Sequence, residues 1–232
     1  MKTLVLFDID GTLVLTGRAG MRALDRALIE VSGDASLLEG MSFAGRTDRA
    51  IVEDALNRLG RPWHEAEFAD VRERYCAYLA DEVQADSPHF KGVLPGVAAA
   101  LDALTPLQRD GQVAVGLLTG NFARGAEIKL AYFDLWRAFA FGAFGDHHAN
   151  RRDLVPLAIE AASASGAGEF QASQIVIVGD TPADVDCGHA HGARVIAVAT
   201  GGYSEAQLRA TGADVVVPDL TAWPSAWAAL QV

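Results

Sequence analysis

The sequence is poor in cysteine and has no long apolar run. Its 232 residues include two cysteines, Cys76 and Cys187, which lie far apart and without further ligands at zinc spacing, so we expect neither a disulfide framework nor structural zinc. This cysteine usage suits a reducing compartment. No apolar stretch approaches the about 20 residues of a membrane span, and the segment before Asp8 is too short for a signal peptide. We therefore expect a soluble, cytoplasmic protein with no membrane partner.

The chain also lacks the positive charge that a nucleic-acid-binding protein needs. It has 19 Lys and Arg residues against 30 Asp and Glu residues, for a formal net charge of −11. An acidic chain without a local basic patch repels a phosphate backbone, so we expect no nucleic-acid partner. With 50% apolar residues the chain is far too apolar to be disordered. Its length suits one large domain, or a domain with a small partner.

Five short segments rich in strand-forming residues end in polar positions. They lie at residues 3–7, 113–118, 175–178, 194–199 and 214–217. Ala-rich helical stretches near 183–191, 204–211 and 221–230 separate the later segments. Strands that alternate with helices predict an α/β fold, with a Rossmann-like parallel sheet as its core and helices on both faces.

The interval from about residue 15 to 92 has helical spacing instead. Apolar residues recur every three or four positions in the segments 21–31, 51–59 and 71–79, with glycine-containing breaks between them. No strand candidate appears in this interval. We therefore predict a small all-α cap at 15–92, inserted into a core formed by 1–14 and 93–232.

Polar residues at three strand ends indicate a binding site, because ligands of open parallel sheets bind beyond the carboxyl ends of the strands. Asp8 and Asp10 lie together where Gly11 lets the chain turn away. Carboxylates in one pocket repel one another unless a cation neutralises them, and hard oxygen ligands suit Mg²⁺. A Thr-Gly-Asn segment at a helix start can hold an anion. Together they predict phosphoryl transfer. The residues are Asp8, Asp10, Thr119, Gly120, Asn121, Asp180 and Asp184.

Three motifs together resemble those of the haloacid dehalogenase-like (HAD) superfamily in order, spacing and position after strands. They are Asp8-Ile9-Asp10-Gly11-Thr12-Leu13, Thr119-Gly120-Asn121 and Gly179-Asp180-Thr181-Pro182-Ala183-Asp184. The resemblance covers essentially the whole core, and the cap lies where the helical-cap, phosphoglycolate-phosphatase-like members carry theirs. It implies a Mg²⁺-dependent phosphatase that acts on a small-molecule phosphate ester.

The resemblance also implies a role for each motif residue. Asp8 is the expected nucleophile, and Asp10 is expected to protonate the leaving oxygen and then activate water. The expected magnesium ligands are the Asp8 carboxylate, the Asp10 backbone carbonyl and the Asp180 carboxylate. The remaining expectations are phosphoryl binding by Thr119, the Gly120 N–H and Asn121, support of the Asp8 loop by Thr12, and a place for Asp184 behind the metal ligands or as an alternative ligand.

The sequence departs from the family pattern where a lysine usually holds the nucleophile and the phosphoryl group. The chain has only Lys2, Lys91 and Lys129, and none follows at the expected place. Two adjacent arginines do, and an arginine supplies the same charge in a forked geometry. We expect Arg151 to take this role, then Arg152, and only then Lys129, whose place inside a helix is typical of an exposed position. The alternative is that the two arginines simply coat a helix start.

The cap offers one candidate substrate contact. Gly45-Arg46-Thr47-Asp48 resembles the turn that reaches toward the active site in the helical-cap group, which makes Arg46 a candidate reader of an anionic group. A plain helix cap at Thr47 or Asp48 is equally compatible. The sequence leaves the ester, the cap residues that face the pocket and the oligomeric state open.

Other chemistries of the superfamily fit less well. A 2-haloacid dehalogenase needs no acid at the second position and no Mg²⁺. A phosphonoacetaldehyde hydrolase needs a cap lysine, and residues 15–90 contain none. A sugar phosphomutase is expected to carry a cap histidine soon after the first motif, where residues 16–22 have none. Two alternatives to the phosphatase remain: a sugar phosphomutase, and a catalytically weak phosphate-binding or regulatory module, which the missing lysine favours.

Overall fold

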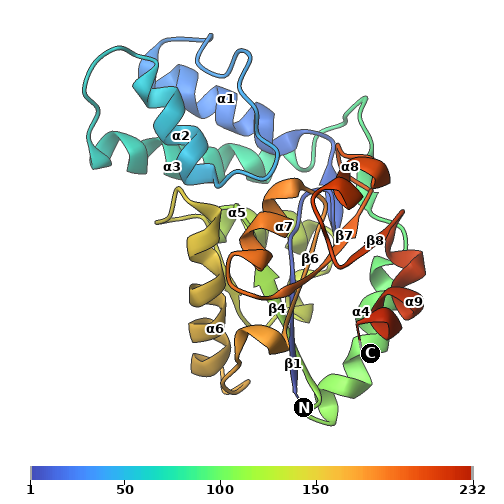
Figure 1. Cartoon of the computed structure of the whole chain (residues 1–232). Coiled ribbons are helices and arrows are strands. Elements are labelled where there is room, and N and C mark those ends of the chain that lie inside the picture. The colour runs from blue at the N-terminus through green and yellow to red at the C-terminus, as the bar shows by residue number, and fades with distance from the viewer. Residues whose placement is uncertain (1, 231–232) are drawn as a thin grey trace.

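A six-stranded parallel sheet carries the helices of the core on its two faces (Figure 1). The computed structural model describes residues 2–230. The strand order is β5-β4-β1-β6-β7-β8, with β1 between β4 and β6, so the predicted Rossmann-like α/β fold is confirmed. The strands are β1 (Thr3–Phe7), β4 (Val113–Leu118), β5 (Gly142–Ala143), β6 (Ile175–Gly179), β7 (Arg194–Val198) and β8 (Val215–Val217).

Alternate side chains of each central strand enter two separate hydrophobic layers. In β1, Val5 and Phe7 face one layer, and Leu4 and Leu6 face the other. A parallel strand covered on both faces requires a continuous apolar run, which is why these strands are visible in the sequence. Helices α4 (Val97–Arg109), α5 (Ala123–Tyr132) and α9 (Trp223–Ala229) cover the first face. Helices α6 (Leu154–Ala164), α7 (Pro182–His189) and α8 (Glu205–Ala210) cover the second.

Three helices lie together above the carboxyl ends of the strands (Figure 1). They are α1 (Ala19–Ser32), α2 (Asp48–Asn57) and α3 (Glu65–Glu82), where the sequence predicts helices. Their apolar faces form a third hydrophobic cluster, into which the core contributes Phe122. The Phe122 ring packs edge-on against Phe68 and Tyr75, with centroids 5.9 Å and 5.8 Å away. Aromatic packing of this kind joins the three helices to the core.

A short antiparallel ribbon connects these helices to the core. It pairs β2 (Val14–Thr16) with β3 (Lys91–Val93). The prediction of no strand between 15 and 92 is therefore wrong at the two edges of that interval. Strand β3 begins with Lys91 and Gly92 and so has no apolar run, and its short partner β2 does not stand out without it. The ribbon stands where we divide the chain, and we keep 1–14 with 93–232 as the core and 15–92 as the cap as a proposed division.

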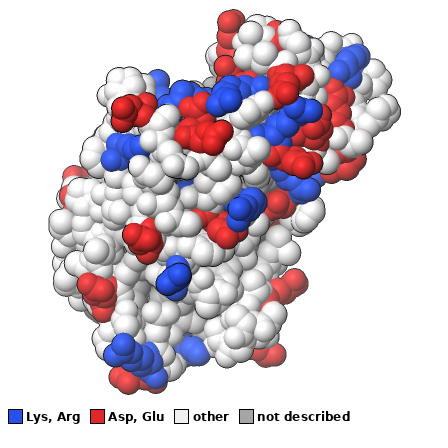
Figure 2. Space-filling model, turned by 180° about the vertical axis from the view of Figure 1, so that it is seen from behind, with Lys and Arg blue, Asp and Glu red and all other residues white. Residues whose placement is uncertain are grey.

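Charged side chains are concentrated on the cap. Figure 2 shows acidic and basic residues intermixed over the cap helices and a core face that is largely uncharged. Many of these charges are paired, as in Arg22–Glu82, Arg61–Glu67 and Arg74–Asp70. Both cysteines are free thiols. Within residues 2–230, no helix combines the length and the apolar character that crossing a bilayer requires.

Candidate active site

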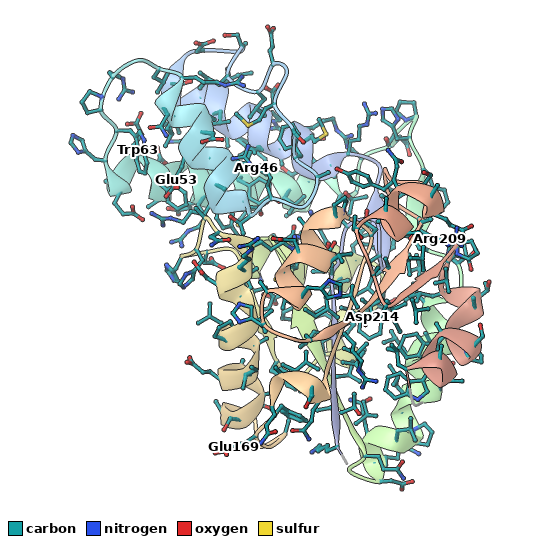
Figure 3. The ribbon with its side chains drawn as sticks, viewed as in Figure 1. Arg46, Glu53, Trp63, Glu169, Arg209 and Asp214 are labelled. Atoms are coloured by element: carbon teal, nitrogen blue, oxygen red, sulfur yellow. The ribbon has the colours of Figure 1, made fainter. Side chains whose placement is uncertain are left out.

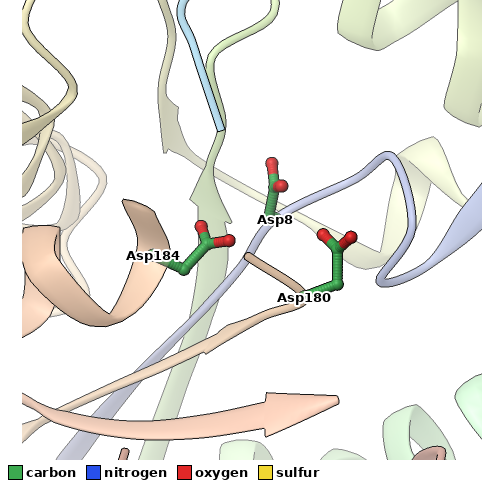
Figure 4. Close-up of side chains that lie close together, drawn as sticks. All are labelled: Asp8, Asp180 and Asp184. Carbon is green, nitrogen blue, oxygen red and sulfur yellow. The ribbon is translucent and has the colours of Figure 1, made fainter. Parts of the chain in front are cut away.

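Three buried carboxylates meet where β1 and β6 end (Figure 4). Asp8 follows β1, Asp180 follows β6, and Asp184 lies in the first turn of α7; an oxygen of each lies within 4.8 Å of the others. Gly11 packs directly on Asp180, because a Cβ atom at Gly11 would lie 2.4 Å from its Oδ2. The Thr12 hydroxyl lies 3.4 Å from Asp180 Oδ1, so the loop that carries Asp8 also supports Asp180.

Burial and repulsion from neighbouring carboxylates disfavour the charged forms of Asp8 and Asp180. Burial raises the pKa of Asp8 to about 6, against the opposing effect of Arg151 and with a further rise from Asp184. Burial, followed by Asp184 and Asp8, raises the pKa of Asp180 well above its usual range. Buried carboxylates that repel one another ionise together only when a cation balances them. The oxygen donors of this cluster therefore fit a hard divalent cation such as Mg²⁺.

Asp184 already accepts three hydrogen bonds from protein donors. Its Oδ2 accepts hydrogen bonds from the Thr181 hydroxyl at 2.7 Å and the Thr181 N–H at 3.0 Å, which caps the start of α7. Its Oδ1 accepts from Arg151 Nη2 at 2.5 Å. Asp8 and Asp180 accept fewer hydrogen bonds from the protein, so these two carboxylates have more capacity left for a metal ion.

The two adjacent arginines point to different places. Arg151 is only 8% exposed, and its Nη2 lies 3.2 Å from Asp8 Oδ2 as well as 2.5 Å from Asp184 Oδ1. Arg152 lies at the surface and pairs with Asp186. The structure thus brings Arg151, the first of our three candidates, to the nucleophile position and leaves Arg152 outside.

The loop after β4 lies beside the carboxylates and under the cap. Thr119 is fully buried, and its hydroxyl bond to Asp8 lowers the pKa of that carboxyl, although burial and Arg151 have larger effects. The Asn121 amide donates to Thr119 Oγ1 at 2.8 Å. A Cβ atom at Gly120 would lie 2.1 Å from the Arg46 carbonyl oxygen. The cap turn therefore rests directly on Gly120.

Arg46 lies on the cap above the strand ends (Figure 3), but its charge is engaged within the cap. Its Nη2 pairs with Asp54 at 2.5 Å and donates to the Ala50 carbonyl at 3.0 Å. Thr47 caps α2 by accepting from the Ala50 N–H at 3.2 Å. The turn thus has the geometry of a helix cap, and a substrate contact by Arg46 stays a prediction.

Lys129 occupies a place that the sequence did not indicate. It is 5% exposed, and its Nζ donates to Asp10 Oδ2 and to Asn121 Oδ1, each at 2.6 Å. The prediction of an exposed position is wrong, because α5 turns this face toward the strand ends. Gly125 and Ala126, which lie on the same face of α5 one turn earlier, are buried as well.

A cavity of about 420 Å³ lies between these residues and the cap. Asp8, Asp10, Thr119, Arg151 and Asp180 line its floor. Its cap-side wall includes several large side chains, and the cavity is therefore suited to a small molecule rather than to an extended polymer. These cap-side residues are Leu15, Met21, Leu24, Phe43, Ile51 and Tyr75.

Comparison with known proteins finds a family model that matches part of the chain and a relative that matches most of it. A family model described as HAD-hydrolase-like matches residues 151–223. The phosphoglycolate phosphatase of Cereibacter sphaeroides is 28% identical over 206 residues, which are 88% of each chain.

Solved structures share the fold over nearly the whole chain. A predicted phosphoglycolate phosphatase of Haemophilus somnus has a TM-score of 0.69 at 18% identity, over 97% of each chain. A β-phosphoglucomutase of Clostridium difficile has a TM-score of 0.70 at 16% identity, over 100% of this chain and 98% of that one. At such low identity the likeness establishes the fold alone.

Proposed function

The chain belongs to the haloacid dehalogenase-like hydrolase superfamily, and on that premise we propose that it is a Mg²⁺-dependent phosphatase that cleaves a small-molecule phosphomonoester through an aspartyl-phosphate on Asp8. The observation that carries the proposal is the setting of Asp8. It is 5% exposed, opens on the cavity floor, and has Arg151 at 3.2 Å and Asp180 in the same carboxylate cluster.

The reaction takes two steps. In the first, an Asp8 carboxylate oxygen attacks phosphorus, the bond from phosphorus to the ester oxygen breaks, and that oxygen takes a proton from the Asp10 carboxyl. In the second, the Asp10 carboxylate takes a proton from water, whose oxygen attacks the phosphorus of the aspartyl-phosphate. Inorganic phosphate leaves, and Asp8 is a free carboxylate again.

We propose that three groups hold the phosphoryl oxygens in both steps. We assign this role to the Thr119 hydroxyl, the Gly120 N–H and the Arg151 guanidinium, all on the cavity floor. Asn121 contributes through its place in the same loop, since its amide is engaged with Thr119 and Asp10. Fixed donors that match charge developing in the transition state are the main source of catalysis in phosphoryl transfer.

Magnesium fits the donors that remain. The Asp8 and Asp180 carboxylates and the Asp10 backbone carbonyl would hold it, with Asp184 behind them fixing Arg151. When bound, the ion neutralises the carboxylates and the phosphoryl oxygens. Without such a cation, burial disfavours the charged form of Asp8 and raises its pKa to about 6.

The substrate is a small ester, because the cap closes one side of the cavity. The activity named for the Cereibacter sphaeroides relative makes 2-phosphoglycolate the first candidate. Glucose phosphates and glycerol phosphates should be tested beside it in one panel of substrates, since the residues of the cap-side wall do not indicate one particular leaving group.

The test is phosphate release from p-nitrophenyl phosphate and this panel, with Mg²⁺ or with EDTA. We expect turnover with Mg²⁺, none with EDTA, and none for Asp8→Asn. The matched control is Asp186→Asn, the same substitution at an exposed acid on α7, which keeps wild-type activity. Turnover in EDTA, or by Asp8→Asn at the wild-type rate, contradicts the proposal.

A sugar phosphomutase is the second candidate, because the β-phosphoglucomutase of Clostridium difficile shares the fold over nearly its whole length. A phosphomutase is expected to convert β-glucose 1-phosphate to glucose 6-phosphate when glucose 1,6-bisphosphate is present, and to release little free phosphate. Phosphorus NMR of one reaction distinguishes the two. A weak binding module is disfavoured, since its ground was the missing positive charge and Arg151 supplies one beside Asp8.

A further inference from the structure

One buried cation in the cavity has no part in the steps described above. Lys129 lies on α5 and is 5% exposed, whereas Lys2 and Lys91 are partly exposed. A buried ammonium group is tolerated only when it is paired and hydrogen-bonded. Both of its side-chain contacts, Asp10 Oδ2 and Asn121 Oδ1, lie at 2.6 Å.

Asn121 contacts both members of the Lys129–Asp10 pair. Its Nδ2 donates to Asp10 Oδ2 at 2.9 Å, so that oxygen receives one bond from Asn121 and one from Lys129. The other oxygen, Oδ1, receives no hydrogen bond from any residue in the described range 2–230, and the Asp10 side chain is 40% exposed. One oxygen is fixed, and the other is free to exchange a proton.

The cap encloses the lysine from above. A Cβ atom at Gly20, in the first turn of α1, would lie 3.4 Å from Lys129 Nζ and 3.6 Å from the Tyr75 hydroxyl. Helices α1 and α3 therefore cover the ammonium, and its position is fixed by packing as well as by its two acceptors. A lysine held in this way contacts Asp10 but cannot move to contact a substrate.

Arg151 and Lys129, two buried cations that line the cavity, thus contact different acids. Arg151 contacts the nucleophile Asp8, and Lys129 contacts Asp10 on the side of α5. We propose that Lys129 is a positioning residue that fixes Asp10 Oδ2, so that Oδ1 faces first the leaving oxygen and then the attacking water. The proposal rests on the proposed function, because it needs Asp10 as the acid and base of that reaction. Lys129 itself does not touch the substrate.

The experiment uses Lys129→Met, which keeps the length of the side chain and removes its donors, with Lys2→Met as the matched control at the far end of β1. Two esters are compared: p-nitrophenyl phosphate, whose leaving group needs no proton, and whichever ester of the panel the wild-type chain cleaves fastest. Each protein is also quenched in acid during turnover to measure the fraction that carries phosphate on Asp8, and its Tm is recorded.

For the panel ester, whose alkoxide leaving group needs a proton, we expect kcat to fall on the order of 100-fold in Lys129→Met, with KM nearly unchanged. Displacement of a general acid by about 1 Å costs roughly this much. With p-nitrophenyl phosphate the first step survives, but the second needs Asp10 as a base. Phosphoenzyme therefore accumulates several-fold over the wild type. Lys129→Arg recovers part of kcat, and Lys2→Met behaves as the wild type.

Three results overturn the role of Lys129. They are an unchanged kcat, a rise in KM alone, and an equal loss on both esters without phosphoenzyme, which is what a structural lysine gives. If Lys129→Met does not fold, Lys129→Gln takes its place, and an unchanged phosphoenzyme fraction in that variant overturns the proposal. A wild-type chain that releases no phosphate with Mg²⁺ overturns the proposed function instead.

Discussion

Arg151 Nη2 lies 3.2 Å from Asp8 Oδ2, and both side chains are buried. The same nitrogen lies 2.5 Å from Asp184 Oδ1. This one guanidinium therefore links the candidate nucleophile to the acid that caps α7. Since the next residue, Arg152, makes a surface pair with Asp186, the chain contains its own matched control.

Arg151→Gln is expected to lower kcat/KM about 100- to 1000-fold, because a fixed charge on the phosphoryl oxygens is lost. It also leaves two buried carboxylates without their cation, which we expect to cost about 3 kcal/mol of unfolding free energy. Arg152→Gln should change stability by less than about 1 kcal/mol, as exposed ion pairs contribute little. Urea unfolding and steady-state kinetics check both. Equal effects of the two substitutions contradict the assignment.

Asp180→Asn is expected to separate stability from metal binding. Burial raises the pKa of Asp180 well above its usual range, so its charged form destabilises the metal-free fold at neutral pH. In EDTA the variant should therefore melt at a higher temperature than the wild type. The rise in Tm that Mg²⁺ gives the wild type by binding to the folded state should be largely lost in the variant. Thermal melts with EDTA and with Mg²⁺ measure both effects. If Mg²⁺ raises the Tm of the variant as much as that of the wild type, Asp180 is not a magnesium ligand.

The features that the sequence predicts best are those that depend on residues close together along the chain. The strands at 3–7 and 113–118 have the bounds that their apolar runs indicate, and Asp8 and Asp180 meet because parallel strands end at one edge of the sheet. Lys129 was missed because its burial depends on Asp10, which is 119 positions away. The choice between two adjacent arginines was open because it depends on how the turn before α6 presents them. Strand β3 was missed for a simpler reason: it begins with Lys91 and Gly92 and so has no apolar run, whereas the equally short β8 (Val215–Val217) does.

Gly120→Ala tests how the cap rests on the core. A Cβ atom there would lie 2.1 Å from the Arg46 carbonyl oxygen, which is backbone and cannot move aside alone. The cap turn must shift, and the Asp48 N–H bond to the Gly120 carbonyl at 2.7 Å must lengthen. We expect a lower Tm and a loss of kcat/KM on the order of 100-fold. Gly202→Ala, where a Cβ atom meets nothing within 4 Å, is the control for Tm; it is not a control for kcat/KM, because Gly202 lines the cavity. A wild-type Tm for Gly120→Ala contradicts the contact.

Asp48 gives the fold a dependence on pH that is separate from the carboxylate cluster. Its Oδ2 accepts from the Phe122 N–H at 2.9 Å. Burial raises its pKa from 3.8 to about 6, although Lys129 and this hydrogen bond lower it. Because the folded pKa lies above the unfolded one, the contribution of Asp48 to stability is complete below about pH 3.8 and is lost as pH rises through about 6.

Asp48→Asn keeps an acceptor for Phe122 and removes this loss. The variant should gain unfolding free energy relative to the wild type between about pH 4 and pH 7, by at most about 3 kcal/mol. Asp186→Asn is the opposing control, since the Arg152 hydrogen bond holds the pKa of Asp186 below its usual value and the variant should lose a little stability over the same range. Urea unfolding across this pH range measures both slopes. A difference between Asp48→Asn and the wild type that stays constant with pH means that Asp48 is charged in the folded protein throughout, and that Lys129 outweighs its burial.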